Sequence, residues 1–419
     1  MRRHTLTLAA LAAGLAMLFV VGRNVETVEG QTRSQGQAPG AGFAAVPGLK
    51  GGQDAFGAYE VVPNWPKPIS ALPGHEQWTW SCVQSVFAET PNRVFLLQRG
   101  ELPVLTEGAR RGVDGSGNPI TLPPRNAALS SPPDNKNLKA GVDYRWEHVV
   151  MVVDAEGNLI ETEKWKQWDH LFIRPHSIYV SPYDPDKHVW IVDDNAHAIF
   201  KFTNDGSRLV QTLGTPKEPG NDDKHFNRPT FMAWLPDGTF FVSDGYANTR
   251  VVKFDKNGKF LMTWGQPGEN GKDTRPGYMN NVHGIAVDPQ TRRVFVNDRN
   301  NHRVQVFDEN GKFLDQWKFG DDPYSSIHLF LIPGDRNLWA ADRNSERILK
   351  YDLDGHFLYQ FGTAGNFPGG FWGIHGMSSD QQGNFYVAEV YSGRVQKFRP
   401  RAGANPAFLL GRPVRAVWE

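Results

Sequence analysis

Residues 282–311 read VHGIAVDPQTRRVFVNDRNNHRVQVFDENG and contain three short runs rich in Val, Ile and Phe, each closed by Asp, Asn, Pro or Gly. Such runs are typical of short antiparallel strands. The Asn310-Gly311 pair predicts a two-residue turn with positive φ at both positions, after which KFLDQW returns as a fourth strand. Four antiparallel strands in about forty residues form one blade of a β-propeller.

The same unit recurs along the chain. Its other copies lie at residues 174–214, 227–265, 326–362 and 373–400, and a degenerate first copy at 82–100 is completed after an insertion by HVVMVVDAEGNLIETEKW. One blade cannot bury both of its faces alone, so the six copies should pack radially and close into a ring. The sequence therefore predicts an all-β fold: a six-bladed β-propeller of four-stranded antiparallel blades that occupies residues 57–419.

The remaining segments lie at the ends of the chain and inside the first copy. Residues 1–22 combine Arg2 and Arg3 with an apolar run, which predicts an export signal and a secreted or periplasmic protein. No small-residue cleavage site follows the run, so an uncleaved membrane anchor is the alternative. Residues 23–56, rich in Gly, Gln and Ala, predict a flexible linker.

Two further segments could complete the ring. Residues 59–68 are expected either to lead into it or to supply a closing strand, and the C-terminal AFLLGRPVRAVWE is expected to supply the last outer strand. Residues 102–144 form a long insertion in the first copy, and so long a loop is usually either functional or mobile.

Composition excludes several classes of partner. The 45 basic and 45 acidic residues give no net charge, which argues against nucleic acid and anionic membranes. The single cysteine, Cys82, rules out a disulfide within the chain. We expect a monomer whose fold is held by packing alone, and a small-molecule or peptide partner.

One residue of each copy falls at the start of the first strand, which is the innermost strand of a blade and lines the central channel. Four of these six residues are histidines, and three of the four alternate around the axis. Three converging imidazoles with an open fourth position are the geometry of a catalytic zinc site, although each histidine alone would more often be structural. In chain order the six are Gln84, His176, Thr230, His283, His328 and His375, of which the alternating triple is His176, His283 and His375. His328 is a secondary candidate, either beside the metal ligands, against substrate, or only lining the channel.

Other candidates follow the second strand of a copy. Arg99 and Arg299 could hold a substrate carboxylate, although Arg343 matches Arg299 in the next copy and both could simply pair with blade acids. Tyr246 has no counterpart, which favours a specific role; a phenol beside a metal ion and an arginine can act as a base. An acid recurs at this place in five copies, which favours a scaffold role for Asp193, Asp244, Asp298, Asp342 and Glu389.

Taken together, these residues resemble the peptidyl-α-hydroxyglycine α-amidating lyases, which are six-bladed propellers of the NHL-repeat type. The resemblance runs from about residue 82 to 400. Its most specific pieces are RPHSI, EPGNDDKHFNRPT, VSDGYANTR, NVHGIAV, NDRNNHRVQVF and the final IHG.

The resemblance implies zinc bound by the three alternating histidines, Tyr246 as the catalytic tyrosine, Arg99 as an essential arginine and Arg299 as a further substrate-side arginine. It implies cleavage of the C–N bond of a peptidyl-α-hydroxyglycine, a carbinolamide, into a peptide amide and glyoxylate.

The family's structural calcium is bound by two backbone carbonyls, at the positions of Val86 and Ile178, and by an aspartate. Gly376 stands at the aspartate's position, so water, another carboxylate or no ion takes its place. The family's disulfide beside the tyrosine is also missing, because Ala247 stands at its cysteine.

Two other functions are compatible with the pattern. A non-catalytic secreted propeller of the NHL type would bind a protein or glycan through its loop face. A calcium-dependent lactonase-like hydrolase would usually carry oxygen ligands on its axis, and imidazoles there disfavour it.

Overall fold

The computed structural model describes residues 55–104, 111–113, 119–121, 138–319 and 325–418. All described residues belong to one compact unit, Gly40–Glu419. The expected export signal and nearly all of the expected linker lie outside the described residues. In the described part of the chain, no helix has both the length and the apolar character needed to cross a membrane.

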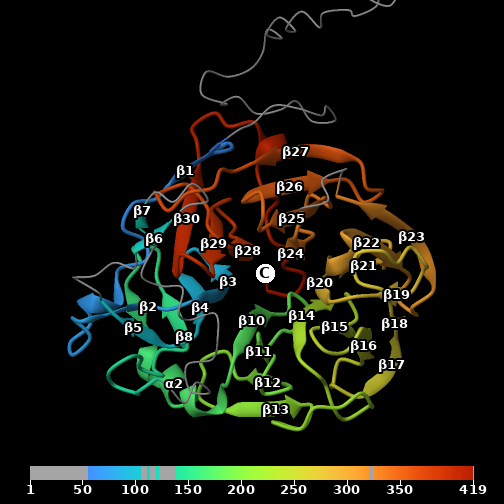
Figure 1. Cartoon of the computed structure of the whole chain (residues 1–419), viewed down its shortest axis with the longest axis horizontal. Helices are drawn as coiled ribbons and strands as arrows, with labels where there is room; N and C mark the ends of the chain where they lie inside the picture. Colours follow the sequence, from blue (N-terminus) through green and yellow to red (C-terminus); the bar gives the residue numbers. More distant parts are fainter. Residues whose placement is uncertain (1–54, 105–110, 114–118, 122–137, 320–324, 419) are drawn as a thin grey trace, which may run out of the picture. The chain divides into compact units, whose positions relative to one another are not determined.

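Six four-stranded antiparallel sheets surround a common centre, which confirms the predicted six-bladed propeller (Figure 1). In each blade the first strand lies innermost and the following strands succeed one another outward. The innermost strands are β3 (Val83–Thr90), β10 (Pro175–Val180), β14 (Pro229–Trp234), β20 (Val282–Val287), β24 (Ile327–Leu331) and β28 (Ile374–Ser379).

The second and third strands are almost wholly buried between neighbouring blades, because their Val, Ile and aromatic side chains pack on both faces. The outermost strands are less buried, and those at Phe260–Trp264 and Phe313–Lys318 contain no fully buried residue. These strands are β4 (Arg93–Gln98), β8 (Val150–Val153) and β9 (Leu159–Ile160); β11 (Val189–Asp193), β12 (Ala198–Phe202) and β13 (Leu209–Leu213); β15 (Phe240–Asp244), β16 (Arg250–Phe254) and β17 (Phe260–Trp264); β21 (Val294–Asp298), β22 (Arg303–Phe307) and β23 (Phe313–Lys318); β25 (Leu338–Asp342), β26 (Arg347–Tyr351) and β27 (Phe357–Phe361); and β29 (Phe385–Glu389) and β30 (Arg394–Pro400).

The predicted insertion separates β4 from β8 within the first blade. One small antiparallel pair lies within it and another joins its start to a strand before β3, while residues 105–110, 114–118 and 122–137 lie outside the described structure. The pairs are β2 (Trp78–Trp80) with β5 (Glu101–Pro103), and β6 (Arg111–Val113) with β7 (Pro119–Thr121).

Short elements lie in the loops between strands and at the two ends of the ring. They are the helix α2 (Thr162–Lys166), the parallel pair β18 (Gln266–Pro267) and β19 (Tyr278–Met279), and the single-turn 3-10 helices η1 (Ile69–Ala71), η4 (Asp169–Leu171), η5 (Arg299–Asn301) and η6 (Pro406–Phe408).

The N-terminal side of the unit closes the ring. Strand β1 (Tyr59–Val61) pairs with β30 and forms the outer strand of the sixth blade. The prediction that the C-terminal segment supplies this strand was therefore wrong. Instead that segment turns through η6 and leaves the sheet. There the Leu410 N–H donates to the side-chain hydroxyl of Tyr59, at 2.8 Å, and not to the backbone of a strand.

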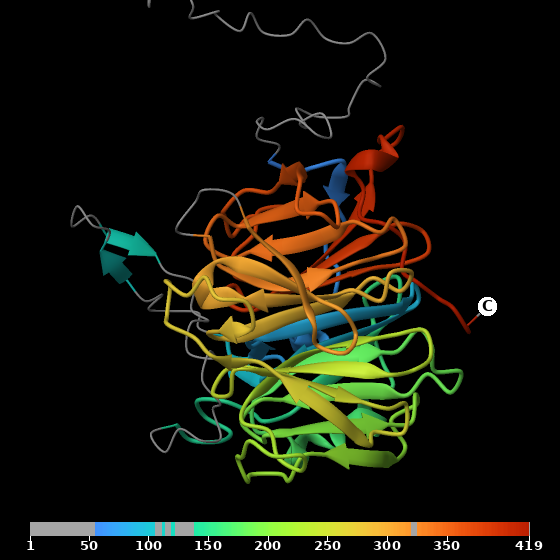
Figure 2. The same cartoon turned by 90° about the vertical axis from the view of Figure 1, so that its right-hand side faces the viewer.

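The C-terminal segment crosses one mouth of the central channel, and the chain ends near the centre of the ring (Figure 1). It is fixed to the fifth blade where Gly334 N–H donates to Arg412 C=O at 2.8 Å, and to the second where Val417 N–H donates to Pro182 C=O at 3.3 Å. Beneath it lies a cavity of about 180 Å³ lined mainly by apolar side chains of the six innermost strands. Figure 2 shows this segment from the side of the ring.

The turn between β22 and β23 differs from the prediction. Gly311 has φ of +77°, but Asn310 is not among the residues with positive φ. The connection is a longer loop between the paired Phe307 and Phe313, and only its glycine has positive φ. The Asp308 carboxylate accepts the N–H groups of Asn310 and Lys312 within this loop, at 2.8 and 2.9 Å.

Tyr59→Phe should lower the free energy of unfolding by about 1–3 kcal/mol, because it leaves the buried Leu410 N–H without its acceptor. Urea unfolding measures the difference. Tyr183→Phe is the matched control: within the described residues its hydroxyl makes no hydrogen bond, so a change within about 0.5 kcal/mol is expected. An equal effect of both substitutions would show that the Tyr59 hydroxyl does not anchor the closure.

Candidate metal centre and the face above it

A β-bulge occurs in every innermost strand at the residue predicted to face the axis. In β10, for example, the pairing with β11 skips His176 between Pro175 and Ser177. A bulge turns the extra side chain out of the regular pleat, here toward the centre of the ring. The same break falls at Gln84, Thr230, His283, His328 and His375.

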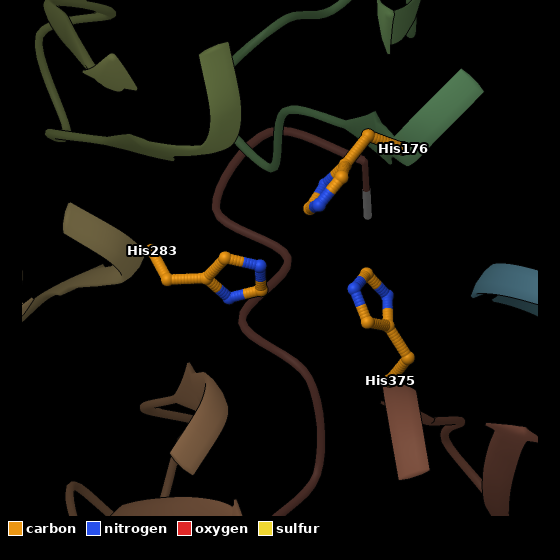
Figure 3. Close-up of side chains that lie close together, drawn as sticks. All are labelled: His176, His283 and His375. Atoms are coloured by element: carbon orange, nitrogen blue, oxygen red, sulfur yellow. The ribbon is translucent and has the colours of Figure 1, made fainter. Parts of the chain in front are cut away.

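The three alternating histidines meet at the axis. Their ring centroids are 5.1 Å apart for His176 and His283, 4.7 Å for His176 and His375, and 5.5 Å for His283 and His375. One nitrogen of each lies within 4.8 Å of the other two. Figure 3 shows the rings converging from three separate strands.

The neighbouring blade fixes the orientation of each ring. Nδ1–H of His176 donates to Thr230 C=O at 2.9 Å, and Nδ1–H of His375 donates to Gln84 C=O at 2.8 Å. His283 makes the same bond to His328 C=O. A carbonyl can only accept, so each imidazole carries its proton on Nδ1 and presents an Nε2 lone pair.

Burial keeps these rings neutral. It is the largest cause of the lowered pKa at all three, and it brings the pKa of His375 to about 3 against the opposing hydrogen bond to Gln84. The pKa values of His176 and His283 are also lowered well below their usual range by burial. Neutral imidazoles are the form that binds a metal ion.

Phe231 packs against all three imidazole rings. The centroid of its ring lies 5.0 Å from that of His176, 5.1 Å from that of His283 and 5.7 Å from that of His375. Phe231 also lines the apolar cavity under the C-terminal segment. The polar centre therefore adjoins an apolar chamber on one side.

Tyr246 lies against the same cluster. Its hydroxyl is 3.1 Å from Nε2 of His176 and 2.9 Å from Nε2 of His283. Gly245 allows this placement, because a Cβ there would lie 1.9 Å from the Val282 carbonyl oxygen of the next blade. Only glycine permits the two blades to approach so closely at this point.

Three arginines surround the Tyr246 ring. The guanidinium carbons of Arg228, Arg299 and Arg174 lie 4.8, 5.4 and 5.9 Å from the ring centroid. Burial lowers the pKa of Arg299, and the adjacent Tyr246 opposes that shift. Within the described residues no carboxylate lies within ion-pair distance of Arg299, and the preceding blade acid, Asp298, pairs with Arg303 at 2.7 Å.

Arg174 and Arg228 were not among the residues predicted from sequence. Both pair with the fully buried Asp194, at 2.9 and 2.6 Å. Two signals could have found these residues: an Arg-Pro pair recurs directly before the first strand in two copies, and Asp194 occupies the position that holds Arg99 and Arg299 in others.

Arg99 is buried deeper than the other arginines. Its Nε donates to Pro175 C=O at 3.4 Å, and its guanidinium lies 4.0 Å from Asp194. Burial lowers its pKa, and the nearby Cys82, Asp194 and Tyr246 oppose that effect. Arg99 therefore lies within electrostatic reach of Tyr246.

His328 lies beside the triple without joining it. Its ring is 5.5 Å from His283 and 4.9 Å from His375, and its Nδ1–H donates to Ile374 C=O at 2.8 Å. The recurring acids act as scaffold: each accepts backbone N–H groups from the loop before its first strand, as Asp193 does from Ile173 at 2.7 Å.

The residues present fit a zinc ion on the axis, since three neutral, buried imidazoles offer Nε2 there. They do not fit the family's calcium. Gly376 offers no side-chain oxygen, and a Cβ at Gly376 would lie 2.8 Å from Cα of Ser85. The carbonyls of Val86 and Ile178 therefore lack a carboxylate at this position, and the fold leaves no room for one.

The chain is similar to a family model, to several curated proteins and to solved structures. A family model described as a 6-bladed beta-propeller matches residues 279–391. Peptidyl-glycine alpha-amidating monooxygenase A of Xenopus laevis is 34% identical over 180 residues, 42% of this chain and 18% of that protein. Peptidyl-alpha-hydroxyglycine alpha-amidating lyase 1 of Drosophila melanogaster is 29% identical over 281 residues, 64% of this chain and 49% of that protein.

NHL repeat-containing protein 3 of Homo sapiens is 31% identical over 175 residues, 39% of this chain and 48% of that protein. The matches thus span less than half the length of these curated relatives. Among solved structures, the virginiamycin B lyase of Staphylococcus aureus matches with a TM-score of 0.43 and 11% identity, over 77% of this chain and 98% of the other. A likeness this weak carries no inference about function.

Proposed function

Because the chain is a six-bladed β-propeller related to the NHL-repeat proteins and to the peptidyl-α-hydroxyglycine α-amidating lyases, we propose that it is a zinc-dependent lyase. Its substrate would be a peptidyl-α-hydroxyglycine-like carbinolamide, and its products an amide and glyoxylate. The observation that carries the proposal is the placement of the Tyr246 hydroxyl within 3.1 Å of two of three converging imidazole nitrogens.

The histidine triple would hold the metal ion, which when bound supplies Lewis-acid chemistry at the substrate hydroxyl. Tyr246 is the only phenol among the described residues that contacts these imidazoles, so it is the group placed to take the hydroxyl proton. As the C–N bond breaks, the same oxygen can return that proton to the departing amide nitrogen, and the reaction balances without an oxidant or a second substrate.

The arginines around Tyr246 supply the positive charge that a glycine carboxylate requires. Arg299 has no acidic partner in the described structure, whereas Arg174 and Arg228 are already paired with Asp194. We therefore assign carboxylate binding to Arg299. Arg99 would add a fixed, buried positive charge near Tyr246.

We also propose that residues 1–22 direct export of the protein.

The direct test is release of glyoxylate from a synthetic peptidyl-α-hydroxyglycine by the purified full-length protein. Glyoxylate and peptide amide should form in equal amounts, stop after treatment with a chelator and return on addition of zinc. No glyoxylate from the folded, zinc-loaded protein would contradict the proposed reaction. A folded protein that neither binds zinc nor releases glyoxylate would favour a non-catalytic binding propeller, and calcium-dependent hydrolysis of a lactone would favour the hydrolase.

A further inference from the structure

A second group of metal-ligating side chains lies away from the axis, beside the insertion of the first blade. His75 follows η1, and Glu147 and His148 lie just before β8. One ligand atom of each of the three lies within 4.8 Å of the other two. Nothing in the lyase chemistry uses these residues.

A buried carboxylate orients both imidazoles. Glu101 is fully buried, and its two oxygens accept hydrogen bonds from Nδ1 of His75, at 2.8 Å, and from Nδ1 of His148. Each ring therefore carries its proton on Nδ1 and has Nε2 left for another partner. A carboxylate that fixes the tautomer of a histidine in this way is the usual support of a metal-binding imidazole.

The backbone at His148 is held in an uncommon conformation. Its φ is +56°, in the left-handed region that residues other than glycine seldom adopt. Its N–H donates to the Asp169 carboxylate at 2.9 Å, and its C=O accepts from the Gln98 amide at 3.1 Å. Two hydrogen bonds thus hold the backbone of His148 in this conformation. Backbone strain that the surrounding structure maintains is typical of functional sites.

We propose that His75, Glu147 and His148 form a second binding site for a divalent transition metal ion. Two imidazoles and a carboxylate are the ligand set that zinc and cobalt favour, and they leave a fourth position for water. Both histidines line an open cavity of about 440 Å³, so an ion can enter from solvent. The ion would join the segment before β2 to the start of β8 on the two sides of the insertion.

Two cations adjoin the site and bear on its affinity. Lys166 pairs with Glu147 at 2.6 Å, and its half-exposed side chain can swing away when a metal ion replaces it. Arg145 lies beside His75, with its guanidinium 3.5 Å from Nδ1 of that ring, and it is held there by a 2.8 Å bond to Gly74 C=O and by contact with the Trp78 ring. Removal of the lysine charge should therefore strengthen metal binding, which a purely structural network would not predict.

The test counts metal ions on the full-length protein after chelation and titration with zinc or cobalt. Wild type should bind two equivalents, and the His283→Ala protein should keep one. Glu147→Gln and His148→Asn should weaken the retained site at least about 10-fold, because each loses a ligand. Asparagine tolerates the left-handed backbone at position 148, so this variant should fold. Lys166→Ala should tighten the site.

His170→Gln is the matched control, since His170 is an exposed histidine nearby whose Nδ1–H donates only to Gln167 C=O at 2.8 Å. It should bind two equivalents, as wild type does. A single equivalent on wild type, abolished by His283→Ala, would overturn the proposal. A Glu147→Gln protein with a lower melting temperature but unchanged metal affinity would also overturn the proposal. It would show that the cluster is only an ion-pair network that stabilises the fold.

Discussion

Replacement of His283 with alanine should lower glyoxylate release by at least about 10²-fold, the lower end of what a catalytic electrostatic centre contributes. The substitution removes one of three Nε2 atoms that converge on the axis, and two imidazoles do not complete a zinc site. Initial rates with the synthetic carbinolamide and the metal content of the axial site would be measured on the same preparation.

His356→Ala is the control for this change. His356 is exposed in the turn after β26 and bonds only to Asp352, at 2.8 Å, so its loss should leave both rate and metal content unaltered. Full activity in the His283 variant would exclude the axial triple as the catalytic centre. Loss of metal with retained activity would exclude the Lewis-acid role in particular.

Tyr246→Phe should reduce kcat by about 10²–10⁴-fold, the range expected for a general base, while KM and axial metal content change little. Phenylalanine keeps the aromatic ring against Arg228 and Arg299 and removes only the oxygen that faces His176 and His283. A steady-state comparison at saturating zinc separates the loss of the base from a loss of substrate binding.

Tyr391→Phe is informative beside it, because Tyr391 also carries a stacked arginine, Arg343 at 5.9 Å, in another blade of the ring. That protein should keep near wild-type kcat. A Tyr246→Phe enzyme with unchanged kcat would mean that another group takes the proton, and an equal loss in both variants would point to a general effect on this face.

The fold could be read from sequence because each blade repeats its strand pattern within about forty residues. The axial residues could be read for the same reason: a position shared by six copies lies at the same radius in each blade. The bulges that turn His176, His283 and His375 inward leave no sequence signal of their own. Alignment of the six copies predicts the axial positions without knowledge of these bulges.

Other features could not be read in this way. The pairing of β1 with β30 joins segments from opposite ends of the chain, and a short apolar run such as Tyr59–Val61 does not specify its partner. Arg174 and Arg228 precede their strands in loops, where spacing does not determine the direction of a side chain. Their place around Tyr246 depends on the buried Asp194, which lies on a different loop from Arg228.

The pairing of β1 with β30 should also slow the folding of the molecule. The sixth blade is completed by the pairing of β1 with β30, and two bonds beside it, from Arg399 to Glu60 and from Leu410 to Tyr59, span 339 and 351 residues. Contacts so distant along the chain form slowly, because the entropy of closing a long loop must be overcome before they stabilise anything. During synthesis of the chain, β1 is made long before its partner β30. Five blades can therefore assemble while the sixth still lacks its outer strand. We expect this last joining to set the rate of refolding.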